Sequence, residues 1–375
     1  MKIRHGALVF AMILSFFMPC RAGAEDALEK KCWDLLKAAQ HASDADARRG
    51  VIGYVWTINS EKIIPLLSEA LDDRSQWVVS GALAAMGKSK ARGIEALIAK
   101  ALSKNSPEVQ GDALQVIGES GRLSDLLTVK KYYGEKEGLL KLYAAAAMAM
   151  LGDRSGLSFI RSSAKSTDLP LRREAVFFMG RIADKESLPL ILKSLKSDDQ
   201  ETARRALLAL GYFPPFVEVT APLLSALTSS DPDTRGAAVM SLGRLNKPET
   251  YERLSSLLED RDWKVRYDLA DILPSWGEKG LGLLRLAMDD SHYMVKLRAA
   301  GALVKKGSLD AKEAILVSMA DPDEIARKFA ARVMGDVGTA DDIKALSPLL
   351  DDESALVRTD AAIAIIRIME RKTKR

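Results

Sequence analysis

Few residues in this chain have the type and spacing that catalysis needs. The segment from Ala82 to Ser89 ends in Gly87-Lys88-Ser89 and matches the loose form of a phosphate-binding loop. Such a loop works where a glycine-rich turn between a strand and a helix lets backbone N–H groups converge on phosphate. After residue 24 the chain holds two histidines, His41 and His292, and neither belongs to a metal-binding pattern such as H-E-x-x-H.

Five arginines could bind a ligand rather than react with it. They stand in three consecutive stretches of the chain, and they are Arg172, Arg173, Arg204, Arg205 and Arg235. A guanidinium group binds carboxylate or phosphate through two parallel hydrogen bonds, so a positive patch formed by these residues would suit acidic ligands. The alternative is a solvated face on which Glu174 and Glu201 compensate the positive charge.

Aromatic residues make up 6% of the chain, yet eight of them gather between residues 212 and 293. Apart from Tyr251, they are Tyr212, Phe213, Phe216, Trp263, Tyr267, Trp276 and Tyr293. Exposed aromatic residues beside arginine are typical of binding hot spots. The alternative is that they fill space beside an irregular part of the fold. We take the arginines and these aromatic residues, Trp276 excepted, as candidate partner-binding residues.

The elements that must position these residues follow from a repeat. An aliphatic residue, here called the rung, recurs about every 31 positions: Leu36, Leu67, Ile98, Val129, Ile160, Ile191, Leu223, Leu254, Leu284, Ile315 and Leu346. A fixed period of this length indicates stacked units, each of which buries its apolar face only against its neighbours. As an open stack, the chain is expected to be less protected around Leu36 and Leu346 than around Ile191.

The sequence pattern predicts two helices in each unit. Eleven residues after each rung comes an anchor position, and three residues before the anchor stands Asp or Ser in nine of the eleven units, residues that cap helix starts. Four residues after the anchor, nine of eleven units have alanine, which predicts close packing between helices. The phosphate-loop match falls on this pattern at the end of a second helix, so we do not expect it to bind nucleotide.

The repeat resembles that of a known family. Asp231 to Gly243, with Thr234, Arg235, Ala238 and Leu242 at the pattern positions, is similar to the motif D-x-x-V-R-x-x-A-A-x-A-L-G of HEAT repeats, in the short form also found in phycobilisome lyases. The resemblance covers about residues 26–370. It implies an all-α, right-handed α-solenoid of about eleven two-helix units, and it says little about activity because such repeats serve many unrelated partners.

The first 24 residues have a different composition. Lys2 and Arg4 precede an apolar run from Ala7 to Met18, and Ala22-Gly23-Ala24 follows, which is the layout of a cleaved secretory signal peptide. The apolar run is too short to span a bilayer. Lipidation at Cys20 is disfavoured because Pro19 precedes it. We therefore expect a signal peptide at 1–24, a solenoid at 25–375, and a periplasmic or secreted protein with no transmembrane segment after cleavage.

Cleavage would lower the formal net charge from +4 to about +1, because Lys2, Arg4 and Arg21 would be lost. Nucleic-acid binding rests on a strong basic excess, so that class is disfavoured. One cysteine, Cys32, would remain, which excludes an intramolecular disulfide. We expect a non-catalytic scaffold or adaptor that binds a protein partner in the bacterial envelope through its concave face, without cofactor or metal. The alternatives are an envelope polymer- or lipid-binding protein and a lyase-like enzyme subunit.

The predicted ion pairs within the repeat have a structural interpretation. Four acids each stand six residues before a base: Asp260 before Arg266, Asp290 before Lys296, Asp321 before Arg327 and Asp352 before Arg358. We expect such acids and bases to form a ladder between neighbouring repeats, in which each acid bonds to a neighbouring base or to a helix start.

Overall fold

The computed structural model describes residues 6–373, which form 22 α-helices and no β-strand. They alternate between two layers. We call the even-numbered helices inner helices: α2 (Ala45–Val55), α4 (Gln76–Lys88), α6 (Pro107–Ser120), α8 (Gly138–Met150), α10 (Leu169–Ile182), α12 (Gln200–Leu210), α14 (Pro232–Leu245), α16 (Trp263–Ile272), α18 (Tyr293–Val304), α20 (Glu324–Val337) and α22 (Ala355–Thr373).

The odd-numbered helices are the outer helices, and most are shorter. They are α1 (Gly6–Gln40), α3 (Ile63–Ala70), α5 (Ile94–Leu102), α7 (Leu126–Glu135), α9 (Leu157–Ser163), α11 (Leu188–Ser194), α13 (Val217–Ala226), α15 (Tyr251–Ser255), α17 (Glu278–Ala287), α19 (Leu309–Ser318) and α21 (Ile343–Leu346). Short 3-10 turns stand beside several of them. Of the predicted signal peptide, residues 1–5 lie outside the described residues.

The predicted caps set where the inner helices begin. Each of the eleven inner helices starts one residue after a predicted cap. Asp199 accepts a hydrogen bond from the backbone N–H of Thr202 at 3.0 Å, and Asp231 accepts one from Thr234 at 2.9 Å. His292 caps α18 in the same way, because its Nδ1 accepts from the N–H of Met294 at 3.3 Å. These bonds satisfy N–H groups that have no partner inside the helix.

The core follows the predicted columns of residues. All eleven rung residues are at most 3% exposed, and all eleven residues four after the anchor, nine of them alanine, are fully buried. The small side chains let neighbouring inner helices approach closely. At Gly180 on α10 the approach is closest, since a methyl group there would collide with the Cα of Ala209 on α12. The predicted all-α repeat fold is confirmed.

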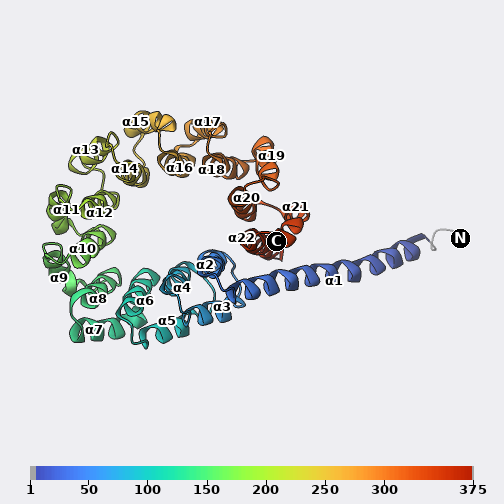
Figure 1. Cartoon of the computed structure of the whole chain (residues 1–375), viewed down its shortest axis with the longest axis horizontal. Coiled ribbons are helices and arrows are strands. Elements are labelled where there is room, and N and C mark those ends of the chain that lie inside the picture. Colours follow the sequence, from blue (N-terminus) through green and yellow to red (C-terminus); the bar gives the residue numbers. More distant parts are fainter. Residues whose placement is uncertain (1–5, 374–375) are drawn as a thin grey trace.

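The stack of helices closes into a ring, which the repeat pattern did not predict. Figure 1 shows the inner helices around a central opening, with the outer helices around them and the last helix beside the first. The last inner helix, α22, packs against α20 and also against α1 and α2. The two ends of the solenoid therefore cap each other, whereas an open solenoid needs polar terminal repeats.

The contact between the ends, which we call the seam, has an apolar interior and a polar edge. Leu356 of α22 packs against Gly50 of α2, where an added Cβ would lie 3.1 Å from the leucine Cδ2. At the edge, Lys31 pairs with Asp351 at 2.8 Å, and Lys372 pairs with Glu25 at 2.7 Å. Residues 359–366 of α22 are all buried, as expected for a helix that is enclosed by neighbours rather than one that ends a stack.

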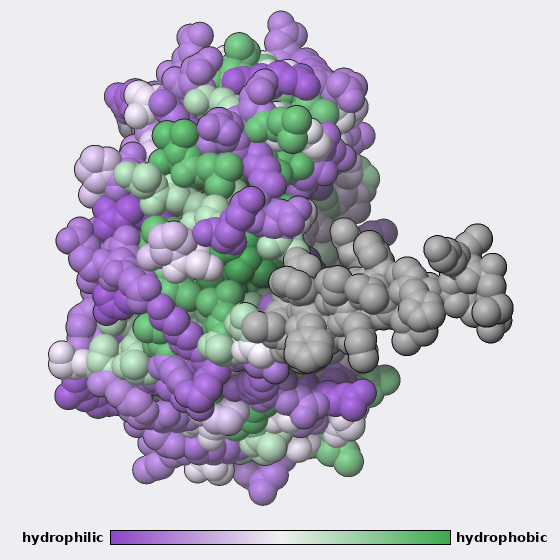
Figure 2. All heavy atoms as spheres, turned by 90° about the vertical axis from the view of Figure 1, so that its right-hand side faces the viewer, coloured by the Kyte–Doolittle hydropathy of each residue, from purple (hydrophilic) through white to green (hydrophobic). Residues whose placement is uncertain are grey.

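The side of the ring that carries the seam is mostly hydrophilic, with apolar residues in a central strip (Figure 2). None of the helices formed by the described residues is long and apolar enough to cross a membrane.

Ring closure changes what hydrogen exchange should show. In place of fraying ends, we expect backbone amides of α22 and of α2 to exchange as slowly as those of α12, because both terminal units are packed on two sides. Mass-spectrometric hydrogen exchange checks this. Exchange in α22 that is faster than in α12 by a factor of ten or more would contradict a closed ring in solution.

Candidate functional site

The inner wall of the ring carries a series of cation–aromatic pairs between neighbouring inner helices. The guanidinium of Arg49 on α2 lies 4.7 Å from the ring centroid of Trp77 on α4. Arg244 on α14 lies 4.6 Å from the ring of Tyr212, which Arg181 on α10 approaches from 5.5 Å. Each pair contributes about 0.5–1 kcal/mol at an exposed site. Such pairs hold aromatic rings in fixed positions on a surface that solvent reaches.

The same arrangement continues across the seam. Tyr54 on α2 has Arg332 of α20 at 4.4 Å and Arg367 of α22 at 5.6 Å from its ring centroid. Its hydroxyl donates to Asp336 of α20 at 3.2 Å. Burial, and then the charge of Asp336, raise the pKa of Tyr54 to about 12. Cation–aromatic pairs of this kind therefore also join the first inner helix to the last two.

In the structure, acidic side chains neutralise most of the predicted arginine cluster. Arg173 forms a two-pronged ion pair with Asp199, and Arg205 pairs with Glu174 and Glu201, each at 2.7 Å. Arg204 pairs with Glu201 and with Asp233. Arg172 donates to the backbone carbonyl of Ser166 at 3.0 Å. The arginines lie on neighbouring inner helices as predicted, but they form a network of ion pairs rather than a positive patch.

Arg235 does not belong to an exposed surface at all. It is 5% exposed, and its Nε and Nη2 each donate to Asp260 at 2.7 Å. Its Nη1 donates to the carbonyls of Ser229 and Ser230. The expectation that this side chain meets a partner is corrected, because it is buried and four of its five N–H donors are already used within the repeat.

Arg235 is one step of the predicted ladder. Arg266 pairs with Asp290, Arg327 pairs with Asp352, and Arg48 pairs with Asp73, all with the acid in the following repeat. Each acid also accepts a hydrogen bond from a helix-start N–H, as Asp260 does from Asp262 at 2.9 Å. Burial alone would raise the pKa of Asp260, but these hydrogen bonds outweigh it and keep the pKa below its usual value. The structural interpretation of the ladder is confirmed.

The predicted aromatic group divides into core and surface. Phe213 is 3% exposed and belongs to the core, which corrects its place among the binding residues. Trp276 is also buried, and it stacks on Tyr251 with 4.1 Å between ring centroids. Phe216 is 51% exposed, but it stands before α13 in the outer layer. Of the others, Trp263 and Tyr267 lie on the inner helix α16, Tyr293 begins the inner helix α18, and Tyr212 follows the end of α12.

Trp263 and Tyr293 share one rim of the ring. The Trp263 ring stacks on His292 with 4.0 Å between centroids, and His292 stacks on Tyr293 at 4.9 Å. Desolvation lowers the pKa of His292. Because its Nδ1 is used as a helix cap and both of its faces are covered, His292 is placed to fix two aromatic residues rather than to transfer protons.

Three predicted residues meet in a pocket on the inner helices. The pocket has a volume of about 450 Å³ and is lined by α12, α14, α16 and α18, with Arg204, Trp263 and Tyr267 among its residues. Two residues that sequence reasoning missed are Asp268 and Gly236. Asp268 stands three residues after its anchor, as do Asp112 and Asp360, and the sequence gives no sign that their surroundings differ. We call this cavity the α14–α16 pocket.

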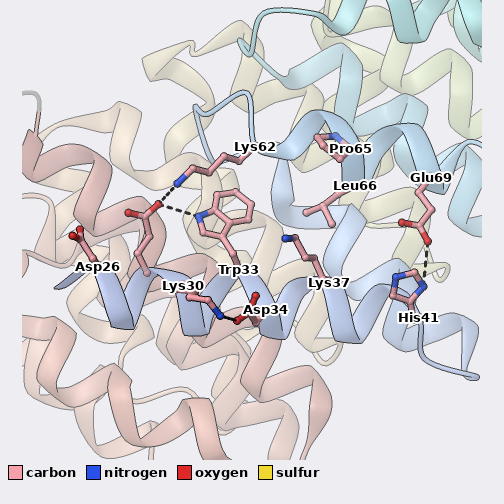
Figure 3. A pocket seen from close by; sticks show the side chains of 11 residues that line it. Asp26, Lys30, Trp33, Asp34, Lys37, His41, Lys62, Pro65, Leu66 and Glu69 are labelled. Carbon is pink, nitrogen blue, oxygen red and sulfur yellow. Dashed lines mark hydrogen bonds and ion pairs between the residues drawn. The ribbon is translucent and has the colours of Figure 1, made fainter. Parts of the chain in front are cut away.

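A larger groove lies between α1 and α3. It has a volume of about 680 Å³ and a floor formed by Trp33, Pro65 and Leu66 (Figure 3). Its charged rim is paired within itself, as Lys62 with Glu29 and Lys30 with Asp34, both at 2.6 Å. The groove thus offers a small apolar floor below a rim on which most of the charged side chains are paired with one another.

Groups suited to catalysis or metal binding are scarce among the described residues. No cluster of three or more histidine, cysteine or acidic side chains in that part of the chain could hold a metal ion. Burial raises the pKa of the Cys32 thiol to about 12, which disfavours the reactive thiolate. Gly87 and Lys88 lie in the last turn of α4, where the chain leaves a helix, so the phosphate-loop match lacks its strand and turn.

Comparison with known proteins supports the repeat. No curated protein matches the chain in sequence. Solved structures that resemble it are the complex of CpcE and CpcF of phycocyanin lyase from Nostoc sp. PCC7120 (19% identity, 57% of this chain and 94% of that chain, TM-score 0.40), human deoxyhypusine hydroxylase in complex with glycerol (16%, 68% and 96%, 0.31), and Kap95p with RanGDP (15%, 91% and 56%, 0.38). At these identities and scores the likeness does not extend to activity or partners.

The family model for HEAT repeats matches residues 34–118, 134–211, 220–277 and 281–366, which together are most of the chain. These segments run from the rung of the first unit to the last inner helix. With eleven inner helices that each begin at the same position of the repeat, they show that the chain belongs to the HEAT-repeat family.

Proposed function

We propose that this protein is a non-catalytic scaffold that holds a segment of a partner protein against the inner wall of its ring. The observation that carries the proposal is the inner wall itself, where arginine and lysine side chains hold aromatic rings across neighbouring inner helices. Fixed aromatic and arginine side chains on a concave surface are what protein-binding hot spots use.

The opening has a size that suits a polypeptide segment. Eleven inner helices at interaxial distances of 8–10 Å form a circle roughly 30 Å across between axes. Side chains extend about 5–6 Å from each helix axis, which leaves an opening of roughly 20 Å. One α-helix or an extended loop fits such an opening, whereas a folded domain does not. A chain terminus or a long loop is therefore the form of partner that we propose.

The site of action is part of the proposal. A signal peptide over residues 1–24 would carry the protein to the periplasm, where it would begin at Glu25. In the ring, Glu25 already contacts Lys372, so a chain that starts there keeps this seam contact. Intact-mass measurement of protein from the periplasmic fraction tests the export step, and a lipid-modified Cys20 would overturn it.

Site-specific photo-cross-linking in cells tests the binding surface. A photoreactive phenylalanine analogue at Trp77 or Tyr267, on the inner wall, is expected to give adducts with one partner. The matched control places it at Leu127 or Leu286, exposed apolar residues of outer helices. Replacing Trp77 and Tyr267 by alanine should reduce partner capture at least tenfold, while the outer pair of alanines should leave it unchanged. Adducts from the outer positions alone would place the partner outside the ring.

A further inference from the structure

The α14–α16 pocket contains a carboxylate at its floor. Asp268 of α16 lies over Gly236 of α14, where even a methyl group would lie 2.6 Å from the Asp268 Oδ2. Leu208, Met240 and Met294 supply apolar walls from three further helix positions. The glycine is what makes room for the carboxylate, since any side chain at position 236 would displace it.

Asp268 differs from the other two aspartates at equivalent positions of other repeats. The Asp112 carboxylate accepts a hydrogen bond from Ser80 Oγ at 2.9 Å, and Asp360 pairs with Arg332 at 2.8 Å. Asp268 has neither a hydrogen bond nor an ion pair with any of the described residues. A part-buried carboxylate without a donor from the chain is held at a cost, and solvent or a bound ligand supplies the donors that the chain does not.

The charges around the pocket favour a cation as that group. Asp233 of α14 lines the pocket together with Asp268. The negative charges of Asp233 and of Asp262, at the start of α16, both disfavour the charged form of Asp268. Burial, followed by the charges of Asp233 and Asp262, raises the pKa of Asp268 to about 6. A neutral donor would leave this repulsion in place, whereas a cation would relieve it.

We infer that the α14–α16 pocket binds the cationic side chain of a lysine or arginine in the partner segment, with the Asp268 carboxylate as its counter-ion. The apolar walls would cover the alkyl part of that side chain. The volume of about 450 Å³ is near the lower end of ligand pockets, which are about 300–1,000 Å³, and suits one long side chain with its neighbouring backbone. This inference rests on the proposed function, since it states what one position of the bound segment must be.

Two cations of the protein itself also line the pocket. Arg204 is held by Glu201 and by Asp233, the latter at 2.9 Å, so its charge is already used. Lys264 is exposed and stands four residues before Asp268 on α16, one helical turn away. If Lys264 supplied the counter-ion in solution, the pocket would have no need of an external cation. The variant Lys264→Gln therefore belongs in the test.

Methionine methyl groups provide the readout. With ¹³C-methyl methionine in the full protein, titration with n-butylguanidinium at pH 8 is expected to shift the resonances of Met240 and Met294 saturably. The uncharged n-butanol should do so at least tenfold more weakly. Asp268→Asn should weaken guanidinium binding at least tenfold, and the matched variant Asp112→Asn should leave it unchanged. Lys264→Gln should bind as well as the wild type.

The affinity should also fall between pH 8 and pH 5, because Asp268, whose pKa is raised to about 6, takes up a proton in that range. Equal binding of n-butanol, or unchanged guanidinium binding in Asp268→Asn, would overturn the inference. The inference would also be overturned if Lys264→Gln bound guanidinium and the wild type did not. The proposed function fails separately: if inner-wall cross-links to the partner form and are unaffected by Asp268→Asn, the scaffold stands and the cation pocket does not.

Discussion

Replacing Arg235 by alanine is expected to lower the free energy of unfolding by about 3–5 kcal/mol, the usual cost of removing one partner from a buried ion pair. The side chains of Arg235 and Asp260 are 6% and 5% exposed, and the substitution leaves Asp260 buried without its main donor. Two backbone carbonyls, of Ser229 and Ser230, lose a donor as well. Urea denaturation followed by circular dichroism measures the change.

The matched control is Arg285→Ala, on the exposed side of α17, which should change the free energy by about 0.5 kcal/mol or less. The double variant Arg235→Met with Asp260→Leu should recover most of the loss, because replacing both charges by apolar groups removes the uncompensated carboxylate. A loss in Arg235→Ala no larger than in the control would mean that the ladder fixes register without stabilising the fold.

The pH dependence of the ladder has a definite sign. Hydrogen bonds from Arg235 and the N–H of Asp262 outweigh burial and hold the pKa of Asp260 below its unfolded value. A depressed pKa means that the unfolded chain binds more protons at low pH. The stability that Asp260 provides is therefore complete above the unfolded pKa of an aspartate and is lost as the pH falls through the folded pKa.

Local structure could be predicted from the sequence because it depends on residues within one unit. The cap at Asp231, the rung at Leu223 and the alanine at Ala238 each act over a few residues or against the adjacent helix. The ladder could be predicted for the same reason, since Arg235 and Asp260 occupy fixed positions in neighbouring units. Because the same pattern recurs in eleven units, an assignment made in one unit is supported by the others, and a domain without repeats has no such support.

Closure of the ring could not be predicted in this way. The curvature of a solenoid is the sum of small rotations at each step, and no residue in one unit shows that the eleventh step will bring Leu356 to Gly50. The seam contacts, such as Tyr54 with Asp336, join residues 282 positions apart in sequence. The sequence pattern of the first and last units is the same as that of the others.

The candidate site was only partly predictable because charge and exposure depend on what each side chain meets. The arginine at 204 and the aromatics at 263 and 267 do line one pocket. Sequence reasoning could not show that Arg235 bonds to the next repeat, or that Phe213 folds back into the core. The residue that now organises the site, Asp268, was missed because an acid on an inner helix is unremarkable until its lack of a donor is seen.

Replacing Asp268 by asparagine is expected to stabilise the protein while weakening the cation binding inferred above. Burial and neighbouring acids raise the pKa of Asp268 from 3.8 to about 6. A raised carboxyl pKa means that the folded state binds more protons than the unfolded chain between these values, so stability falls as the pH rises through that range and stays lower above it. Asparagine, which carries no charge, removes this loss.

Two pKa units correspond to nearly 3 kcal/mol at most, and because Asp268 is partly open to solvent we expect about 1–2 kcal/mol at pH 8. At pH 4 the variant and the wild type should differ little, since Asp268 is then protonated in the folded wild type and, like asparagine, carries no charge. Urea denaturation at the two pH values checks this. Asp112→Asn is the comparison: burial also raises the pKa of Asp112, but a hydrogen bond from Ser80 opposes the rise, so the gain in stability should be smaller. A variant less stable than wild type at pH 8 would show that Asp268 has a stabilising partner within the ring. If Asp268→Asn is more stable than the wild type and no longer binds guanidinium, then Asp268 lowers the stability of the fold in exchange for binding, as is common at functional sites.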